Sequence, residues 1–142
     1  MAVVNTISNH FKYMLFTKKI DASADVFKII LMDNNFAFDK DAHATLADLS
    51  GQLATQFGYT QNNKVLAGVV VTESDALDKC TVVWSDATWT ANGGAIGPTG
   101  AAIIYDDTTT DKTVVCCIDF GADFTTPDGT SFQIQAPEVD LS

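Results

Sequence analysis

The sequence predicts a mainly β protein, a single-domain β-sandwich or jelly-roll-like barrel with one short α-helix at about residues 41–55. Three observations lead to this prediction. Six runs are rich in β-branched and aromatic residues, which favour strands. Clusters of turn-forming residues separate these runs, and one other stretch has apolar residues at helical spacing. Strands that recur every ten to fifteen residues or so are typical of sandwiches and barrels.

The chain begins with a segment of ambiguous pattern, HFKYMLFTKKI at 10–20. It suits a strand or a helix, and we interpret it as an extended arm or a short helix. Turn signals such as MDNNF, TQNNK, DDTTTDK and TTPDGT then separate the later runs. Strands are predicted at 26–32, 64–71, 79–84, 100–106, 112–120 and 130–135.

The predicted helix lies in DKDAHATLADLSGQLATQ at 39–56. Leu46, Leu49 and Leu53 recur there at helical spacing, and Asp39 or Asp41 is available as an N-cap. We expect this helix to cover the mouth or one edge of the sandwich.

Length and composition indicate one folded domain. A chain of 142 residues suits one domain. We divide it into an amino-terminal arm or first element at 1–20, expected to contact a partner, and a single β-sandwich domain at 21–142. Charged residues make up only 18 %, below the roughly 25 % that is usual, so part of the surface is expected to lie against a partner.

The charge pattern argues against nucleic acid as a partner. The formal net charge is −10, and all eight basic residues are lysines. An acidic chain without arginine repels phosphates and lacks the side chain most used to read bases. Four lysines fall in the first thirty residues, which favours either docking to an acidic or mixed-charge partner or a solvated strand edge.

The apolar runs and the cysteines indicate the compartment. No run approaches the ~20 apolar residues that cross a bilayer, and the amino terminus does not have the pattern of a signal peptide. We therefore expect no membrane partner and synthesis in the cytoplasm. Cys116 and Cys117 are adjacent within a predicted strand, so they point to opposite faces and cannot form an unstrained bridge. With Cys80, they are expected to be free, buried thiols.

A glycine-rich loop, ANGGAIGPTG at 91–100, raises the question of a phosphate site. A phosphate loop needs a following helix and a lysine, whereas here a strand follows and no lysine lies between Lys79 and Lys112. We therefore interpret it as a loop that bends between two strands. Its small residues allow it to lie against its own sandwich or against a neighbouring subunit.

The sequence contains no strong motif for a catalytic or metal-binding site. Ser50, His43 and Asp48 resemble a triad only in composition, since no nucleophile-elbow motif accompanies them. The aromatic residues, Trp84 and Trp89 among them, are expected in the core rather than on a stacking platform. Five aspartates form at most a weak surface cation site, because the EF-hand pattern is missing: Asp106, Asp107, Asp111, Asp119 and Asp123. No catalytic, cofactor or metal residue is predicted, and we expect a non-enzymatic protein.

The order of motifs along the chain resembles small virion structural proteins of tailed bacteriophages. FKYMLFTKKIDASADVFKIILMDNNFAFDKDAHATLADL resembles the opening of that family. GYTQNNKVLAGVVV, VVWSDATWTANGGAIGPTGAAIIYDD and IDFGADFTTPDGTSFQIQAPEVDLS are similar to its middle and closing segments. Each motif is weak by itself, and together they cover nearly the whole chain.

The resemblance implies a capsid decoration or cement protein on the outer surface of the head. Its implied partners are the major capsid protein and copies of itself, as a dimer or trimer on the particle. The alternative is a tail or fibre module that binds a host surface or glycan and exposes aromatics such as Trp89. For the contact surface we predict His10, Phe11, Lys12, Tyr13, Phe16, Gly94 and Gly97.

Overall fold

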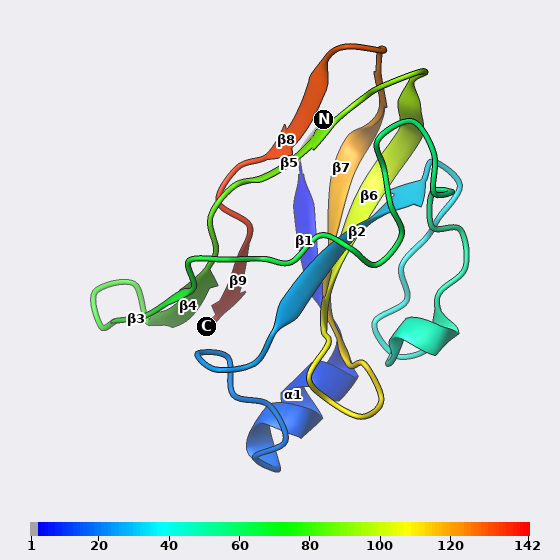
Figure 1. Ribbon diagram of the computed structural model, residues 1–142. Coiled ribbons are helices and arrows are strands. Elements are labelled where there is room, and N and C mark those ends of the chain that lie inside the picture. The colour runs from blue at the N-terminus through cyan, green and yellow to red at the C-terminus, as the bar shows by residue number, and fades with distance from the viewer. Residues whose placement is uncertain (1–2) are drawn as a thin grey trace.

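A computed structural model describes residues 3–142 and confirms the mainly β, sandwich-like, single-domain fold (Figure 1). The strands form three antiparallel sheets, ordered β1-β7-β6-β2, β3-β4-β9 and β5-β8. The elements are β1 (Val4–Ile7), α1 (Asn9–Phe16), β2 (Phe27–Asp33), the 3₁₀ turn η1 (Leu46–Asp48), β3 (Val70–Ser74), β4 (Lys79–Val83), β5 (Ala87–Thr90), β6 (Ile96–Asp106), β7 (Val114–Thr126), β8 (Ser131–Ile134) and β9 (Glu138–Leu141).

The four-stranded sheet is buried on both faces. Along β2, Ile29 and Leu31 point into one apolar cluster, while Ile30 and Met32 point into another. This follows from the period of two in a strand. It also explains why FKIILM is a continuous apolar run instead of an alternating one.

One face of this sheet is covered by the two small sheets. Trp84, Trp89 and Val139 come from that side and pack in the same cluster as Ile29 and Leu31. Figure 1 shows the small sheets on one side of β2, β6 and β7, with the cyan-green segment that contains η1 on the other. The two layers of strands make the sandwich.

The other face is covered by the irregular segment 34–50. Phe36, Phe38, Leu46 and Leu49 from this segment pack against Ile30 and its neighbours. The predicted helix at 41–55 is therefore wrong in its position and its type, because only the 3₁₀ turn Leu46–Asp48 forms there. Leu46 and Leu49 do face the core, Leu46 from the 3₁₀ turn and Leu49 from the position directly after it.

Local hydrogen bonds explain why residues 41–55 do not form an α-helix. Asp39 Oδ1 accepts the N–H groups of Asp41 and Ala42, and Asp48 Oδ2 accepts those of Ala44 and Thr45. Such side-chain acceptors compete with helical hydrogen bonds. The neighbouring backbone pairs with the sheets instead, through bridges that join Thr45 to Thr113 and Gln52 to Met32.

The α-helix of the structure is in the amino-terminal segment, at Asn9–Phe16. Phe11 is 3 % exposed, and Met14 and Leu15 pack against the same cluster at i+3 and i+4. The backbone of Lys18 has φ of 60° just after the helix, and Lys19 N–H donates to the Met14 carbonyl. This left-handed residue ends α1 in the manner of a C-terminal cap.

Of the two alternatives for residues 1–20, an arm or a first element of the fold, the described residues form the second. β1 pairs with β7, and Phe11 packs in the core, so residues 4–16 contribute to the sandwich. Met1 and Ala2 of that predicted arm lie outside the described residues. Of the other predictions, the run at 64–71 becomes a strand only from Val70 onward, and β1, β5 and β9 are strands that the sequence patterns did not indicate.

Substituting the two phenylalanines of α1 separates their roles in stability. Phe11→Ala removes a buried ring and is expected to lower the free energy of unfolding by about 3–5 kcal/mol. Phe16→Ala removes an exposed ring and is expected to change it by less than about 0.5 kcal/mol. Chemical denaturation measures both values. Equal losses would contradict the assignment of Phe11 to the core.

Candidate partner-binding surfaces

The exposed face of α1 carries two aromatic side chains. Tyr13 is 61 % exposed and Phe16 is 91 % exposed, and their spacing of three places them on one side of the helix. Lys12, Lys18 and Lys19 are exposed on and just after the same helix. We call these five residues the α1 patch.

His10 supports this patch from the preceding turn of the helix. Its ring stacks on Tyr13 with 5.9 Å between centroids, and its Nε2 lies 2.9 Å from Asp111 Oδ2. Asp111 Oδ1 also accepts the hydroxyl of Thr113. Burial acts to raise the pKa of Asp111, but the hydrogen bonds from Thr113 and His10 outweigh it and hold that pKa below its usual value.

The seven residues predicted to contact a partner lie in three different environments. His10, Lys12, Tyr13 and Phe16 lie on α1 at or near the surface, whereas Phe11 points into the core. The two glycines contact their own chain. A Cβ on Gly94 would lie 2.5 Å from the Phe57 ring, and a Cβ on Gly97, where φ is +121°, would lie 2.5 Å from the Phe124 carbonyl oxygen.

The glycine-rich loop therefore allows close packing within the domain. At Gly97 a side chain would meet the backbone of β7, and the positive φ favours glycine in any case. The strand predicted to follow the loop at residue 100 is β6, and it starts earlier, at Ile96. The second half of the predicted loop therefore belongs to β6.

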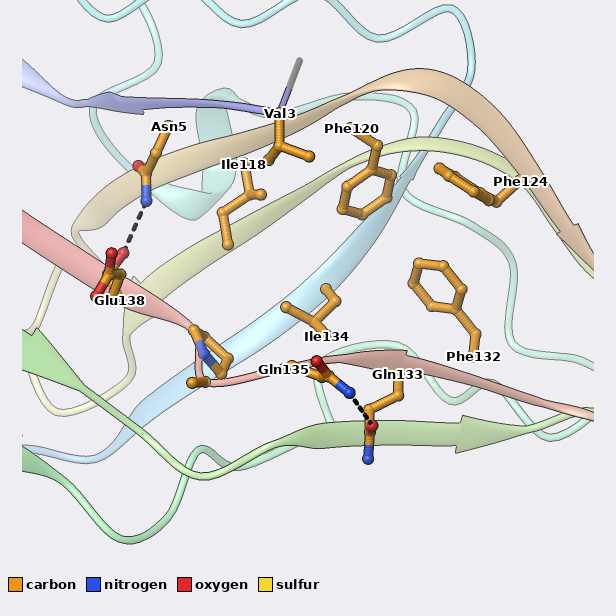
Figure 2. Close-up of a pocket in the computed structure, with 12 residues that line it drawn as sticks. Val3, Asn5, Ile118, Phe120, Phe124, Phe132, Gln133, Ile134, Gln135 and Glu138 are labelled. Atoms are coloured by element: carbon orange, nitrogen blue, oxygen red, sulfur yellow. Dashed lines mark hydrogen bonds between the residues drawn. The ribbon is translucent and has the colours of Figure 1, made fainter. Parts of the chain in front are cut away.

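A second exposed apolar feature is a groove of about 540 Å³ between β7 and β8 (Figure 2). Phe120 and Phe124 come from β7, and Phe132 and Ile134 come from β8. The three phenyl rings contact one another with centroids 5.6–5.9 Å apart. The sequence placed these rings in the core, and the period of two gives no sign that they lie at its open edge.

Trp89, which the fibre alternative requires to be exposed, is 3 % exposed. It packs between Tyr59 and Phe132, and Lys64 Nζ lies 5.5 Å from its ring centroid. This agrees with the expectation that the tryptophans belong to the core, because Trp84 is also 3 % exposed.

The three residues compared with a catalytic triad bind other groups. His43 Nδ1 accepts the N–H of Asp39, and the imidazole packs against Phe36 and Phe38. Asp48 accepts from the backbone of the η1 turn, where Thr45 is the N-cap. His43 and Ser50 both line a small pocket, but Asp48 does not.

The aspartates considered for a weak cation site each bind a different group of the protein. Asp107 contacts Lys112 at 3.0 Å and Lys28 at 3.3 Å, and these lysines hold the pKa of Asp107 below its usual value. Asp119 accepts the N–H of Gly121, and Asp123 accepts from Asn34. Within residues 3–142 no group of three or more potential metal ligands comes together.

The cysteines are free thiols, as predicted, but Cys80 is only half-buried. Cys116 and Cys117 are buried in the clusters on opposite faces of the main sheet. Burial raises the pKa of both thiols, so they stay protonated at neutral pH. Among residues 3–142 no helix is long and apolar enough to span a membrane.

One buried carboxyl group is an exception to the acidic surface. Asp106 ends β6 and is fully buried; its Oδ1 accepts the Thr108 N–H at 2.9 Å. Burial, followed by the hydrogen bond and charge of Asp25, raises the pKa of Asp106 to about 7. In the folded protein Asp106 therefore keeps its proton up to about pH 7.

The raised pKa of Asp106 predicts that the stability of the fold depends on pH. Between the unfolded pKa of 3.8 and the folded pKa of about 7, only the folded protein keeps the proton of Asp106. The contribution of this group to the free energy of unfolding therefore falls as the pH rises from about 4 to about 7, and it stays lost above that range.

Asp106→Asn removes this titration but keeps a donor toward Asp25. Between about pH 5 and about pH 8, the native chain is expected to lose roughly 2–4 kcal/mol more than the variant. Chemical denaturation at both pH values measures the difference, with the exposed Glu73→Gln as the control. If the free energy of unfolding fell equally with pH in the native chain and in Asp106→Asn, a raised pKa of Asp106 would be contradicted.

No protein-family model, curated protein or solved structure matches this chain. The α1 patch and the groove are therefore interpreted from their own chemistry.

Proposed function

We propose that this chain is a bacteriophage virion protein that decorates the capsid. In this proposal it binds the outer surface of the major capsid protein through the α1 patch and stabilises the shell. The observation that carries the proposal is the 91 % exposure of Phe16 beside the exposed Tyr13.

An exposed ring at this position favours a binding role. Phe16 adds little to the core, whereas aromatic side chains are the usual anchors of protein interfaces. Burying a phenylalanine against a partner contributes about 1.5–3 kcal/mol from apolar area. The α1 patch therefore has the chemistry of an interface centre.

The charge distribution favours one orientation on the particle. Lys12, Lys18 and Lys19 are exposed on or just after the helix that carries the two rings, although the whole chain has a net charge of −10. Such asymmetry steers the lysine-bearing end toward an acidic or mixed-charge surface. The acidic remainder of the protein would then face the solvent.

Binding energy gained on the assembled shell stabilises that shell by mass action. Copies of this chain, as a dimer or trimer around one site of the lattice, would add to the effect through multivalency. The motif order that resembles small phage virion proteins supports the same role. We prefer decoration to a glycan-binding fibre module because the aromatic side chain expected for the latter, Trp89, is in the core.

The proposal predicts that the α1 patch determines capsid binding. Phe16→Ala is expected to weaken binding to shells of the same phage's major capsid protein at least about tenfold, because an anchor of about 2 kcal/mol is lost. Adding Tyr13→Ala is expected to weaken it further. Co-sedimentation across a range of protein concentrations measures the dissociation constant.

Leu77→Ala is the matched control, because Leu77 is an exposed apolar residue in the turn between β3 and β4. Its binding is expected to equal that of the native chain. Undiminished binding by the Tyr13→Ala, Phe16→Ala double variant would contradict the proposal.

A further inference from the structure

We propose that the groove between β7 and β8 is a docking site for an extended apolar segment of a different protein, which adds as a strand beside β8. This site is distinct from the α1 patch and does not depend on the role of that patch. Figure 1 shows α1 at one end of the molecule and β8 at the other.

The outer edge of β8 has no neighbouring strand in the structure of residues 3–142. β8 pairs with β5 alone, and β1 is likewise the edge strand of the main sheet. Residues of β1, β7 and β8 line the groove but residues of β5 do not. The groove therefore lies on the unpaired side of β8.

The register indicates which backbone groups are available on that edge. Ala91 N–H donates to the Thr130 carbonyl at 2.8 Å, one residue pair beyond Thr90 and Ser131, where β5 ends and β8 begins. Hydrogen-bonded pairs alternate in an antiparallel ladder, so Phe132 bonds to Trp89. The backbone N–H and C=O of Ser131 and Gln133 then point away from β5 and can pair with an added strand.

The walls of the groove suit the alternate side chains of such a strand. Phe120, Phe124 and Phe132 form one apolar surface, and Phe124 remains 44 % exposed (Figure 2). Asn5 Nδ2 donates to the Glu138 carbonyl at 2.7 Å and bridges β1 to β9 at the other end of the groove. A strand beside β8 would cover the rings, and this is the geometry of β-strand addition.

The occupant is apolar and peptidic rather than a sugar. Two amide side chains of the groove already bond within the domain: Gln133 Nε2 donates to Thr88 Oγ1, and Gln135 Nε2 donates to Gln133 Oε1. Phenyl rings and unpaired backbone groups remain. These recognise apolar side chains and a polypeptide backbone, respectively.

The occupant belongs to a different chain and has basic flanks. A second copy could meet this edge only through one of its own edge strands, because every strand within residues 3–142 is already paired on at least one side. Two copies would also each bring a net charge of −10. Among residues 3–142, Glu138 is the only charged residue that lines the groove, which favours positive charge beside the docked segment.

The test uses the native chain and a synthetic octapeptide of alternating threonine and valine with a lysine at each end. Binding is measured by NMR titration and calorimetry. We expect saturable binding that shifts the amide signals of Ser131 and Gln133 and protects the Gln133 N–H from hydrogen exchange. Replacing the lysines by glutamates is expected to weaken binding, and a central proline is expected to abolish it.

Two variants and one control distinguish strand addition from non-specific contact. Gln133→Pro removes the N–H that points away from β5, and Phe124→Ala removes the most exposed of the three phenyl rings; each is expected to weaken binding at least tenfold. Phe16→Ala, in the α1 patch, is expected to bind as the native chain does. Thermal unfolding confirms that each variant folds, and Phe124→Ala alone tests the site if Gln133→Pro does not fold.

Three outcomes would overturn the proposal. The first is the absence of saturable binding by the octapeptide, and the second is undiminished binding by Phe124→Ala. The third is a native chain that forms a dimer in sedimentation equilibrium, which Phe124→Ala dissociates, because the groove would then be an interface between copies. None of these outcomes bears on capsid binding by the α1 patch.

Discussion

The double-sided burial of one sheet is the constraint on which the rest of the fold depends. β2, β6 and the first half of β7 place apolar residues on both faces, so each face needs a cover. The two small sheets cover one face, and segment 34–50 covers the other. Phe11 of α1 completes the first cover, which is why the amino-terminal segment is part of the domain. Stability thus depends on short elements that are far apart in the sequence.

The same constraint leaves two apolar features exposed. α1 is amphipathic, so burying Phe11 turns Phe16 to the solvent. The small sheet β5-β8 is too narrow to cover the whole of β7, so the rings of Phe120 and Phe124 meet an open edge. An α1 patch with lysines and a groove without them give an acidic protein two chemically different contacts.

Strands β2, β4, β6, β7 and β8 were predictable from the sequence because their signals are local, whereas the four-residue strands β1, β5 and β9 were not. The run at 26–32 matched β2 within one residue, and Cys116 and Cys117 divided between the two faces as expected. The helix was misplaced because Leu46 and Leu49 have helical spacing, while Asp39 and Asp48 bind the backbone that a helix would use. The groove could not be predicted from the sequence, because it arises from an unpaired strand edge, which depends on the pairing of distant strands.

The proposed capsid-decorating role can be tested through the location and copy number of this chain on purified virions. Quantitative mass spectrometry and a cryo-electron microscopy reconstruction of the same particles would supply both. If the chain decorates the capsid through the α1 patch, it is expected in many copies per particle, at a fixed ratio to the major capsid protein, with α1 against the shell. A handful of copies at the tail, or copies on the shell with α1 turned to the solvent, would contradict this role.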